Sequence, residues 1–177
     1  ACLRTQCEAR GETFSSDTDS EVAAHLIGRF YGEKGDLLGA VSAAAELLAG
    51  SYAFAVLAED KEEIVCARMR SPLIVACGPD GVFAASDVPA VAKAGRVAYV
   101  LEDGDFARLT RGKIELFDGA LRPVVREAVA LEEEEVSPGK GEFRHFMRKE
   151  ISEVPAAVLN SLPDLSKPEF SGVCKVL

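Results

Sequence analysis

The chain has 177 residues, of which 48% are hydrophobic and 28% charged, and its formal net charge is -9 at pH 7. A chain of this length forms one hydrophobic core more readily than two. Its acidic excess would repel a nucleic-acid backbone, and no basic cluster offsets it. No apolar run could span a bilayer, and the first residues lack the apolar core of a signal peptide. We therefore expect a soluble, cytoplasmic protein with no nucleic-acid or membrane partner.

The cysteine and histidine content argues against disulfides and metal sites. The cysteines are odd in number and include no Cys-x-x-Cys pair, a pattern that favours reduced thiols over a disulfide framework or a zinc site. Only His25 and His145 are present. We expect no metal and no cofactor. Cys66 and Cys77 alternate with apolar neighbours and are predicted to be buried core thiols.

Helical patterns fill the first third of the chain. Residues 3–10 are typical of a helix that ends at Gly11, since glycine adopts the left-handed cap conformation at low cost. Apolar residues then recur at helical spacing over 22–30 and again over 38–48. Both stretches predict amphipathic helices, which end at glycines 32, 35 or 50.

From Ser51 the period changes to that of strands. Short runs rich in Val, Ile, Phe and Tyr alternate with charged or glycine-containing turns, which predicts an antiparallel meander over 51–60, 63–69, 72–78, 81–87 and 96–118. Residues 52–57 are apolar on both faces, so we expect at least one sheet to be covered on both sides. A short helix is predicted over 87–94, with Asp87 at its start.

The last third of the chain is less regular. Residues 131–142 combine four consecutive glutamates with Pro and Gly, which favours a solvated linker. Residues 143–162 are predicted to be helical, with an interruption at Pro155. A loop follows over 163–177 and leads into a short apolar strand. A chain that stops inside a strand-like run suggests a truncated sequence.

Six stretches in order resemble the glutaminase domain of the glucosamine-6-phosphate synthase family, over roughly residues 3–162. They are "EARGETFSSDTDSEVAAHLI", "LLAGSYAFAVL", "ARMRSPLIVACG", "FAASDVPAV", "YVLEDGDFARLTRGKIELFD" and "FRHFMRKEISEVPAAVLNSL". The resemblance implies an α+β fold, a partial N-terminal-nucleophile hydrolase αββα sandwich of antiparallel sheets flanked by helices. It also implies a partial glutaminase domain over 1–150 and an interdomain helix and linker over 151–177, toward an isomerase domain that is absent.

In that family the glutaminase releases ammonia from glutamine, and the isomerase half uses it to make glucosamine 6-phosphate from fructose 6-phosphate. The family nucleophile is an N-terminal cysteine followed by Gly-Ile-Val. Here residue 1 is Ala1, and Cys2 precedes Leu3 in a predicted helix. The Arg-Trp-Ala-Thr-His-Gly carboxylate clamp and the His-Asn-Gly-Ile-Ile oxyanion stretch have no counterpart either. We therefore expect no catalytic residue in this chain and no activity by the chain alone.

Asp19 is the one position to which the resemblance assigns a role. The family's Ser-Glu-Thr-Asp-Thr-Glu stretch uses this aspartate to bind the α-ammonium group of glutamine, and a carboxylate suits that task because it accepts charge-assisted hydrogen bonds. The residues alone also fit a simple helix start. Thr18 and Glu21 are spaced as a capping box, and acids in the first turn favour the positive end of the helix dipole.

The remaining polar candidates have structural explanations. His25 is expected to be a surface or packing histidine rather than a general base, because no Ser or Cys partner is suitably spaced. His145 could form a phosphate site with Arg144 and Arg148. These three residues are expected instead to face solvent or a neighbouring domain. Two Ser-containing pairs, Ser71-Pro72 and Ser86-Asp87, are typical of turns.

Two functions remain open from the sequence. The chain is either an incomplete part of an amidotransferase with glutamine as its family substrate, or a non-catalytic binding or dimerisation module derived from one. In both cases sheet edges would be left unpaired, which favours either a homodimer or a missing N-terminal half as partner.

Overall fold

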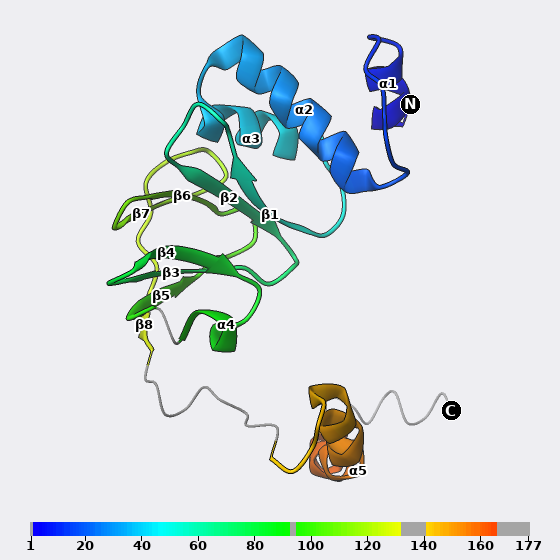
Figure 1. The fold of residues 1–177 in the computed structure, drawn as a ribbon, viewed down its shortest axis with the longest axis vertical. Helices are drawn as coiled ribbons and strands as arrows, with labels where there is room; N and C mark the ends of the chain where they lie inside the picture. Colours follow the sequence, from blue (N-terminus) through cyan, green and yellow to red (C-terminus); the bar gives the residue numbers. More distant parts are fainter. Residues whose placement is uncertain (1, 93–94, 132–140, 166–177) are drawn as a thin grey trace. The chain divides into compact units, whose positions relative to one another are not determined.

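The computed structural model describes residues 2–92, 95–131 and 141–165. The chain divides into two compact units, Ala1–Val136 and Ser137–Leu177, and Figure 1 shows the elements in chain order. In the described part of the first unit these are α1 (Leu3–Glu8), α2 (Asp19–Lys34), α3 (Leu37–Ala45), β1 (Tyr52–Leu57), β2 (Ile64–Met69), β3 (Ile74–Gly78), β4 (Gly81–Ala85), α4 (Val88–Ala92), β5 (Val97–Val100), β6 (Phe106–Thr110), β7 (Lys113–Phe117) and β8 (Ala128–Ala130). The second unit contributes α5 (Phe146–Leu165).

The corner between α2 and α3 is set by two adjacent caps. Gly35 ends α2 in the left-handed region with φ of 67° and donates its N–H to the carbonyl of Tyr31 over 2.8 Å. Asp36 then starts α3, and its carboxylate accepts the N–H of Gly39 over 2.8 Å. Glycine after the helix and aspartate before the next one satisfy backbone groups that would otherwise be unpaired. The two predicted amphipathic helices are confirmed.

The strands form two antiparallel sheets with the orders β1-β2-β6-β7 and β4-β3-β5-β8. Cys66 lies opposite Ala55 on one side and Ala107 on the other, so β2 is central in the first sheet. The predicted antiparallel strands over 51–118 are confirmed. The sequence did not predict β8, because its three residues are all exposed and show no periodicity.

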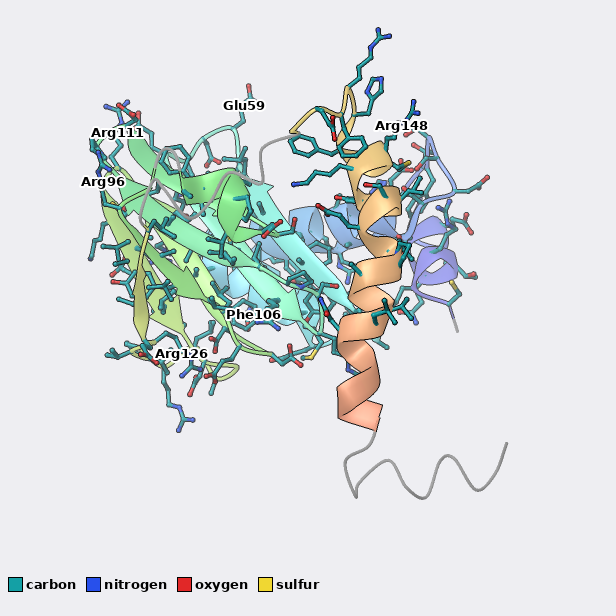
Figure 2. All side chains as sticks on the ribbon, turned by 90° about the horizontal axis from the view of Figure 1, so that it is seen from below. Glu59, Arg96, Phe106, Arg111, Arg126 and Arg148 are labelled. Atoms are coloured by element: carbon teal, nitrogen blue, oxygen red, sulfur yellow. The ribbon has the colours of Figure 1, made fainter. Side chains whose placement is uncertain are left out.

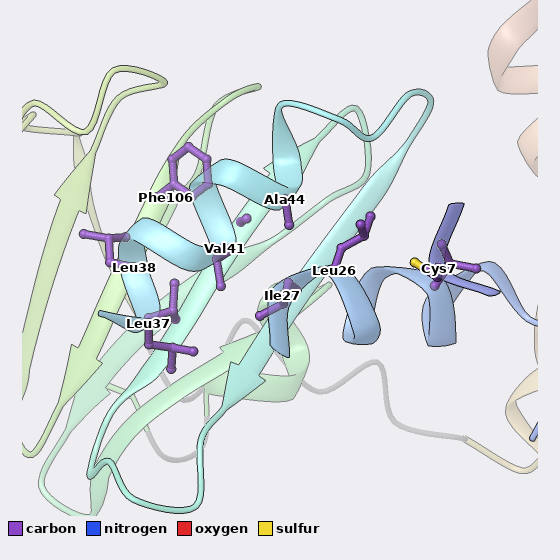
Figure 3. Packing of buried hydrophobic residues seen from close by; sticks show 11 residues of the cluster. Cys7, Leu26, Ile27, Leu37, Leu38, Val41, Ala44 and Phe106 are labelled. Carbon is purple, nitrogen blue, oxygen red and sulfur yellow. The ribbon is translucent and has the colours of Figure 1, made fainter. Parts of the chain in front are cut away.

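Three hydrophobic clusters separate four layers. The first packs α1, α2 and α3 on one face of the first sheet. Figure 3 labels its members Leu26 of α2, Leu37 and Val41 of α3, and Phe106 of β6. The second cluster lies between the two sheets and contains Val75 and Leu109. The third packs α4 against the outer face of the second sheet. The first unit is therefore an αββα sandwich, as expected.

Two burial expectations were only partly correct. β2 is buried on both faces, but in β1 the residues Ala53, Ala55 and Leu57 are exposed, Leu57 by 71%. The reason is that β1 is an edge strand within the part of the chain that the structure describes. Cys66 is fully buried as predicted, whereas Cys77 is only half-buried because it lies near the end of β3.

The second unit is described by α5. The predicted interruption at Pro155 was wrong, since the helix runs without a break to Leu165, although this proline has no N–H to donate. Apolar side chains are exposed along it at spacings of three and four residues, namely Met147, Ile151, Val154 and Val158. The predicted linker over 131–142 and loop over 163–177 lie mostly outside the described residues.

Candidate functional site

Asp19 is the first residue of α2 and is exposed to solvent. It lines a hollow of about 780 Å³ together with residues of α1, β1 and three loops, among them Arg4, Leu48, Tyr52, Ser71 and Ser86. Within residues 2–92, 95–131 and 141–165, the Asp19 carboxylate makes no hydrogen bond or ion pair. A carboxylate in this position can accept hydrogen bonds from a cationic ligand without first breaking contacts of its own.

The predicted capping box is wrong in its geometry. The Thr18 side chain makes no cap hydrogen bond. Glu21 instead accepts four hydrogen bonds from the loop before the helix. Oε1 of Glu21 accepts hydrogen bonds from the N–H of Ser15 over 2.7 Å and from the hydroxyl of Ser15 over 2.8 Å. Oε2 of Glu21 accepts hydrogen bonds from the N–H and the hydroxyl of Ser16, over 2.7 and 2.6 Å. The carboxylate therefore fixes a loop rather than closing a capping box.

These donors change the acidity of Glu21. The N–H of Ser15, and then the hydroxyl of Ser16, lower the pKa of Glu21 from 4.5 to about 2. Hydrogen bonds to a carboxylate stabilise its charged form and so resist protonation. Glu21 consequently stays an acceptor at any pH near neutrality.

Arg4 of α1 holds the same loop from its other side. Its Nη2 donates to the carbonyl of Ser16 over 2.8 Å and to that of Thr18 over 3.3 Å. Its guanidinium carbon lies 4.3 Å from the centre of the Phe14 ring, which is a cation–π contact. The two residues that flank Asp17 are thus fixed through their backbone carbonyls.

His25 packs beneath this loop, as the sequence predicted. Its ring centre is 4.4 Å from that of Phe14, and its Nδ1 is 3.1 Å from Oε2 of Glu12. Glu12 also contacts the thiol of Cys7, whose pKa is raised first by burial and then by this carboxylate. The Nε2 of His25 is also 4.0 Å from Oε1 of Glu21. His25 therefore has a packing role, with two carboxylates rather than a nucleophile as its polar partners.

Sequence reasoning missed that Ser71 and Ser86 share a hollow with Asp19. Ser71 does lie in a turn, since its N–H reaches the carbonyl of Met69 over 2.7 Å. The local patterns predict turns at both serines, but they do not reveal which turns lie side by side in space. Cys2, which precedes α1 and is exposed, lines the same hollow.

The C-terminal candidates are solvent-exposed within their own unit. His145 and Arg144 precede α5, and Arg148 lies in its first turn; all three are exposed. Figure 2 labels Arg148. In the described residues no three His, Cys, Asp or Glu side chains are arranged to hold a metal ion. Nor does any described helix have the length and apolar character needed to cross a bilayer.

The glutamine amidotransferase domain family matches residues 1–93 of this sequence, which is more than half of the chain. The chain belongs to this family. Among curated relatives of this amidotransferase domain, the glutamine–fructose-6-phosphate aminotransferase (isomerizing) of Thermus thermophilus is 47% identical over 160 residues. Those of Xanthomonas campestris and Clostridium perfringens are 42% and 40% identical. Each alignment covers 90% of this chain but only 26% of the relative.

Solved structures of amidotransferases resemble the fold. The glutamine phosphoribosylpyrophosphate amidotransferase of B. subtilis, in complex with ADP and GMP, superimposes with a TM-score of 0.56 and 25% identity. The match covers 68% of this chain and 27% of that chain. The structure of an allosteric regulatory enzyme of purine biosynthesis superimposes with a TM-score of 0.54. The N-terminal-nucleophile fold class expected from the sequence is therefore confirmed for this amidotransferase domain.

Proposed function

We propose that the chain is part of the glutaminase domain of a glutamine–fructose-6-phosphate aminotransferase, in which the amide nitrogen of glutamine is transferred to fructose 6-phosphate to give glucosamine 6-phosphate. In this proposal Asp19 binds the α-ammonium group of glutamine. The observation that carries it is the carboxylate of Asp19 on the wall of the 780 Å³ hollow, which has no hydrogen-bond or ion-pair partner among the residues that the structure describes. An ammonium ion would donate to this carboxylate through short, charge-assisted hydrogen bonds.

We further propose that these 177 residues do not hydrolyse glutamine by themselves. Amide hydrolysis by this family requires a thiol nucleophile with its base, a clamp for the substrate carboxylate and donors for the oxyanion. None of the corresponding motifs occurs among these residues. The chain would contribute binding and scaffold to the reaction, and the domain roles assigned to residues 1–150 and 151–177 remain part of this proposal.

Ammonia release tests both parts. The purified chain is incubated with L-glutamine, with and without a polypeptide that supplies the missing motifs from the Thermus thermophilus relative. We expect no release by the chain alone, release by the mixture, and a loss of that release with Asp19→Asn. The control Glu33→Gln, which removes an exposed carboxylate elsewhere on α2, should keep the activity of the mixture. Robust turnover by the chain alone would contradict the proposed incompleteness.

One observation favours a second function, that of a non-catalytic dimerisation module. The backbone edge of β1 is unpaired within the described residues. Beside it lies an apolar hollow of about 870 Å³ between α2 and β1, lined by Ile27, Phe54 and Val56 among others. A free edge next to an apolar groove is a surface on which another strand can pair. Sedimentation should then give a dimer that Ala55→Pro dissociates, whereas a monomer at micromolar concentration would count against this function.

A further inference from the structure

We propose that Glu21 and Arg4 are positioning residues, which hold the loop before α2 so that Asp19 is presented to the ammonium group of an amino-acid substrate. This inference rests on the proposed role of Asp19 in glutamine binding. It assigns the task of orientation to two residues that act on the loop before Asp19 and not by accepting a hydrogen bond from the ammonium group.

The first support is the number of hydrogen bonds that converge on Glu21. Two backbone N–H groups and two hydroxyls, from Ser15 and Ser16, lie 2.6 to 2.8 Å from its oxygens. Glu21 follows Asp19 by two residues on the same helix, so the helix that carries Asp19 also holds the loop that leads into it. The hydroxyl of Ser16 continues the connection to that of Thr18 over 2.8 Å.

The second support is that Arg4 reaches the same loop from a separate helix. It donates to the carbonyls of Ser16 and Thr18, and Thr18 immediately precedes Asp19. Its own helix is anchored, because Cys7 of α1 is fully buried in the core shared with α2. Arg4 also lines the hollow that Asp19 lines. Two independent elements therefore fix the backbone on the N-terminal side of Asp19.

The third support is the state of Asp19 itself. Because its carboxylate makes no hydrogen bond or ion pair within the described part of the chain, its position depends on the backbone around it. A charge-assisted hydrogen bond to an ammonium ion needs a defined oxygen position, and a supporting set of contacts supplies that definition. If the loop moved freely, part of the binding free energy would be spent on ordering it when the ligand binds.

A purely structural role of Glu21 and Arg4 makes a different prediction. If they only stabilised the fold, their loss would weaken all ligands of the hollow by the same factor. If they position Asp19, their loss would weaken only ligands that carry an ammonium group. L-Glutamine and N-acetyl-L-glutamine separate the two cases, since the acetylated compound lacks the positive charge.

The experiment is a calorimetric or NMR titration of the full chain with both compounds. The variant Glu21→Gln keeps the size of the side chain, but its amide nitrogen cannot accept the two hydrogen bonds from one serine. We expect its Kd for L-glutamine to rise about tenfold, with the Kd for N-acetyl-L-glutamine unchanged. Arg4→Met should act in the same direction, and Arg4→Lys should restore part of the affinity. The control Glu33→Gln changes an exposed acid elsewhere on α2 and should change neither Kd.

The outcomes distinguish this inference from the function on which it rests. If the wild-type chain does not discriminate between the two compounds, or if Asp19→Asn leaves the discrimination intact, the proposed role of Asp19 is wrong and the inference falls with it. If Asp19→Asn abolishes the discrimination while Glu21→Gln and Arg4→Met preserve it, only the positioning role is wrong. Equal weakening of both compounds by Glu21→Gln would also overturn it.

Discussion

The guanidinium group of Arg126 donates two hydrogen bonds to the carboxylate of Asp105, from Nη2 to Oδ1 over 2.7 Å and from Nε to Oδ2 over 2.8 Å. Asp105 is only 2% exposed and also accepts the N–H of Glu102 over 2.8 Å. This bidentate pair joins the segment before β8 to the turn before β6. The pKa of Arg126 is raised, mainly by this hydrogen bonding with Asp105.

We expect Arg126→Met to destabilise the first unit. The substitution leaves a buried carboxylate without its cationic partner, which is costly because the charge is not compensated. The midpoint of thermal unfolding should fall by roughly 10 °C. The control Arg111→Met removes an arginine whose side chain is 90% exposed and should shift the midpoint by less than about 1 °C. An equal shift in both variants would contradict the prediction.

Glu21 should make stability depend on acid pH. Its pKa is lowered from 4.5 to about 2 in the folded chain, so the unfolded state binds the proton more readily. The stabilisation by the charged form is present above about pH 4.5 and is lost as the pH falls toward 2. Urea unfolding from pH 5 to 2 should therefore show a decline that Glu21→Gln reduces. Glu33→Gln should leave the decline as it is in the wild type.

The thiols should differ in reactivity. Burial raises the pKa of Cys66 to about 12, so little of it is thiolate at pH 8, and solvent does not reach it in the native state. Cys2 is exposed. With a disulfide reagent at pH 8, Cys2 should react at least about 100-fold faster than Cys66. The variants Cys2→Ser and Cys66→Ser show which kinetic phase of the reaction belongs to which thiol. Denaturant should make the slow phase fast, because unfolding exposes the buried thiol.

Arg70 adopts a backbone conformation that suits glycine. Its φ is 60°, and its N–H donates to the Asp103 carboxylate over 2.8 Å at the end of β2. A non-glycine residue in this left-handed region destabilises the folded state by about 1 kcal/mol or more. Replacement by glycine removes this strain, but part of the gain is offset because glycine has more conformational freedom in the unfolded state. We expect Arg70→Gly to raise the free energy of unfolding by about 0.5 kcal/mol, measured in urea. A matched substitution at ordinary φ, Arg111→Gly, should give no increase.

The sequence predicted the helices and strands whose apolar residues recur with a regular period. The stripe from Val22 to Phe30 defined α2, and the alternation after Ser51 defined the antiparallel strands. Both patterns arise because one face of each element must be buried, so apolar residues recur with the period of that element. The resemblance added the fold class, and the position of Asp19 on the wall of a hollow could then be anticipated in part.

The failures concern contacts between distant residues. The capping box was predicted from Thr18 and Glu21 alone, but Glu21 bonds to Ser15 and Ser16 because the loop folds back along the helix. The contact of Arg4 with Phe14 depends on how α1 packs, which no spacing encodes. Ser71 and Ser86 line the same hollow as Asp19 only after the two sheets have formed. Each of these features is decided by tertiary packing, which outweighs local propensity.

The attachment of α1 has a consequence for local unfolding. Cys7 joins this helix to the core, and Arg4 joins it to the loop that leads into α2. Detachment of α1 would remove the Arg4 contacts to the carbonyls of Ser16 and Thr18, whereas the N–H of Ser16 would stay bonded to Glu21 of α2. The amide proton of Gln6 in α1 should therefore exchange with a lower opening free energy than that of Ser16 in the loop. One of the two attachments of the segment that leads to Asp19 would then last only as long as the short helix before it stays in place.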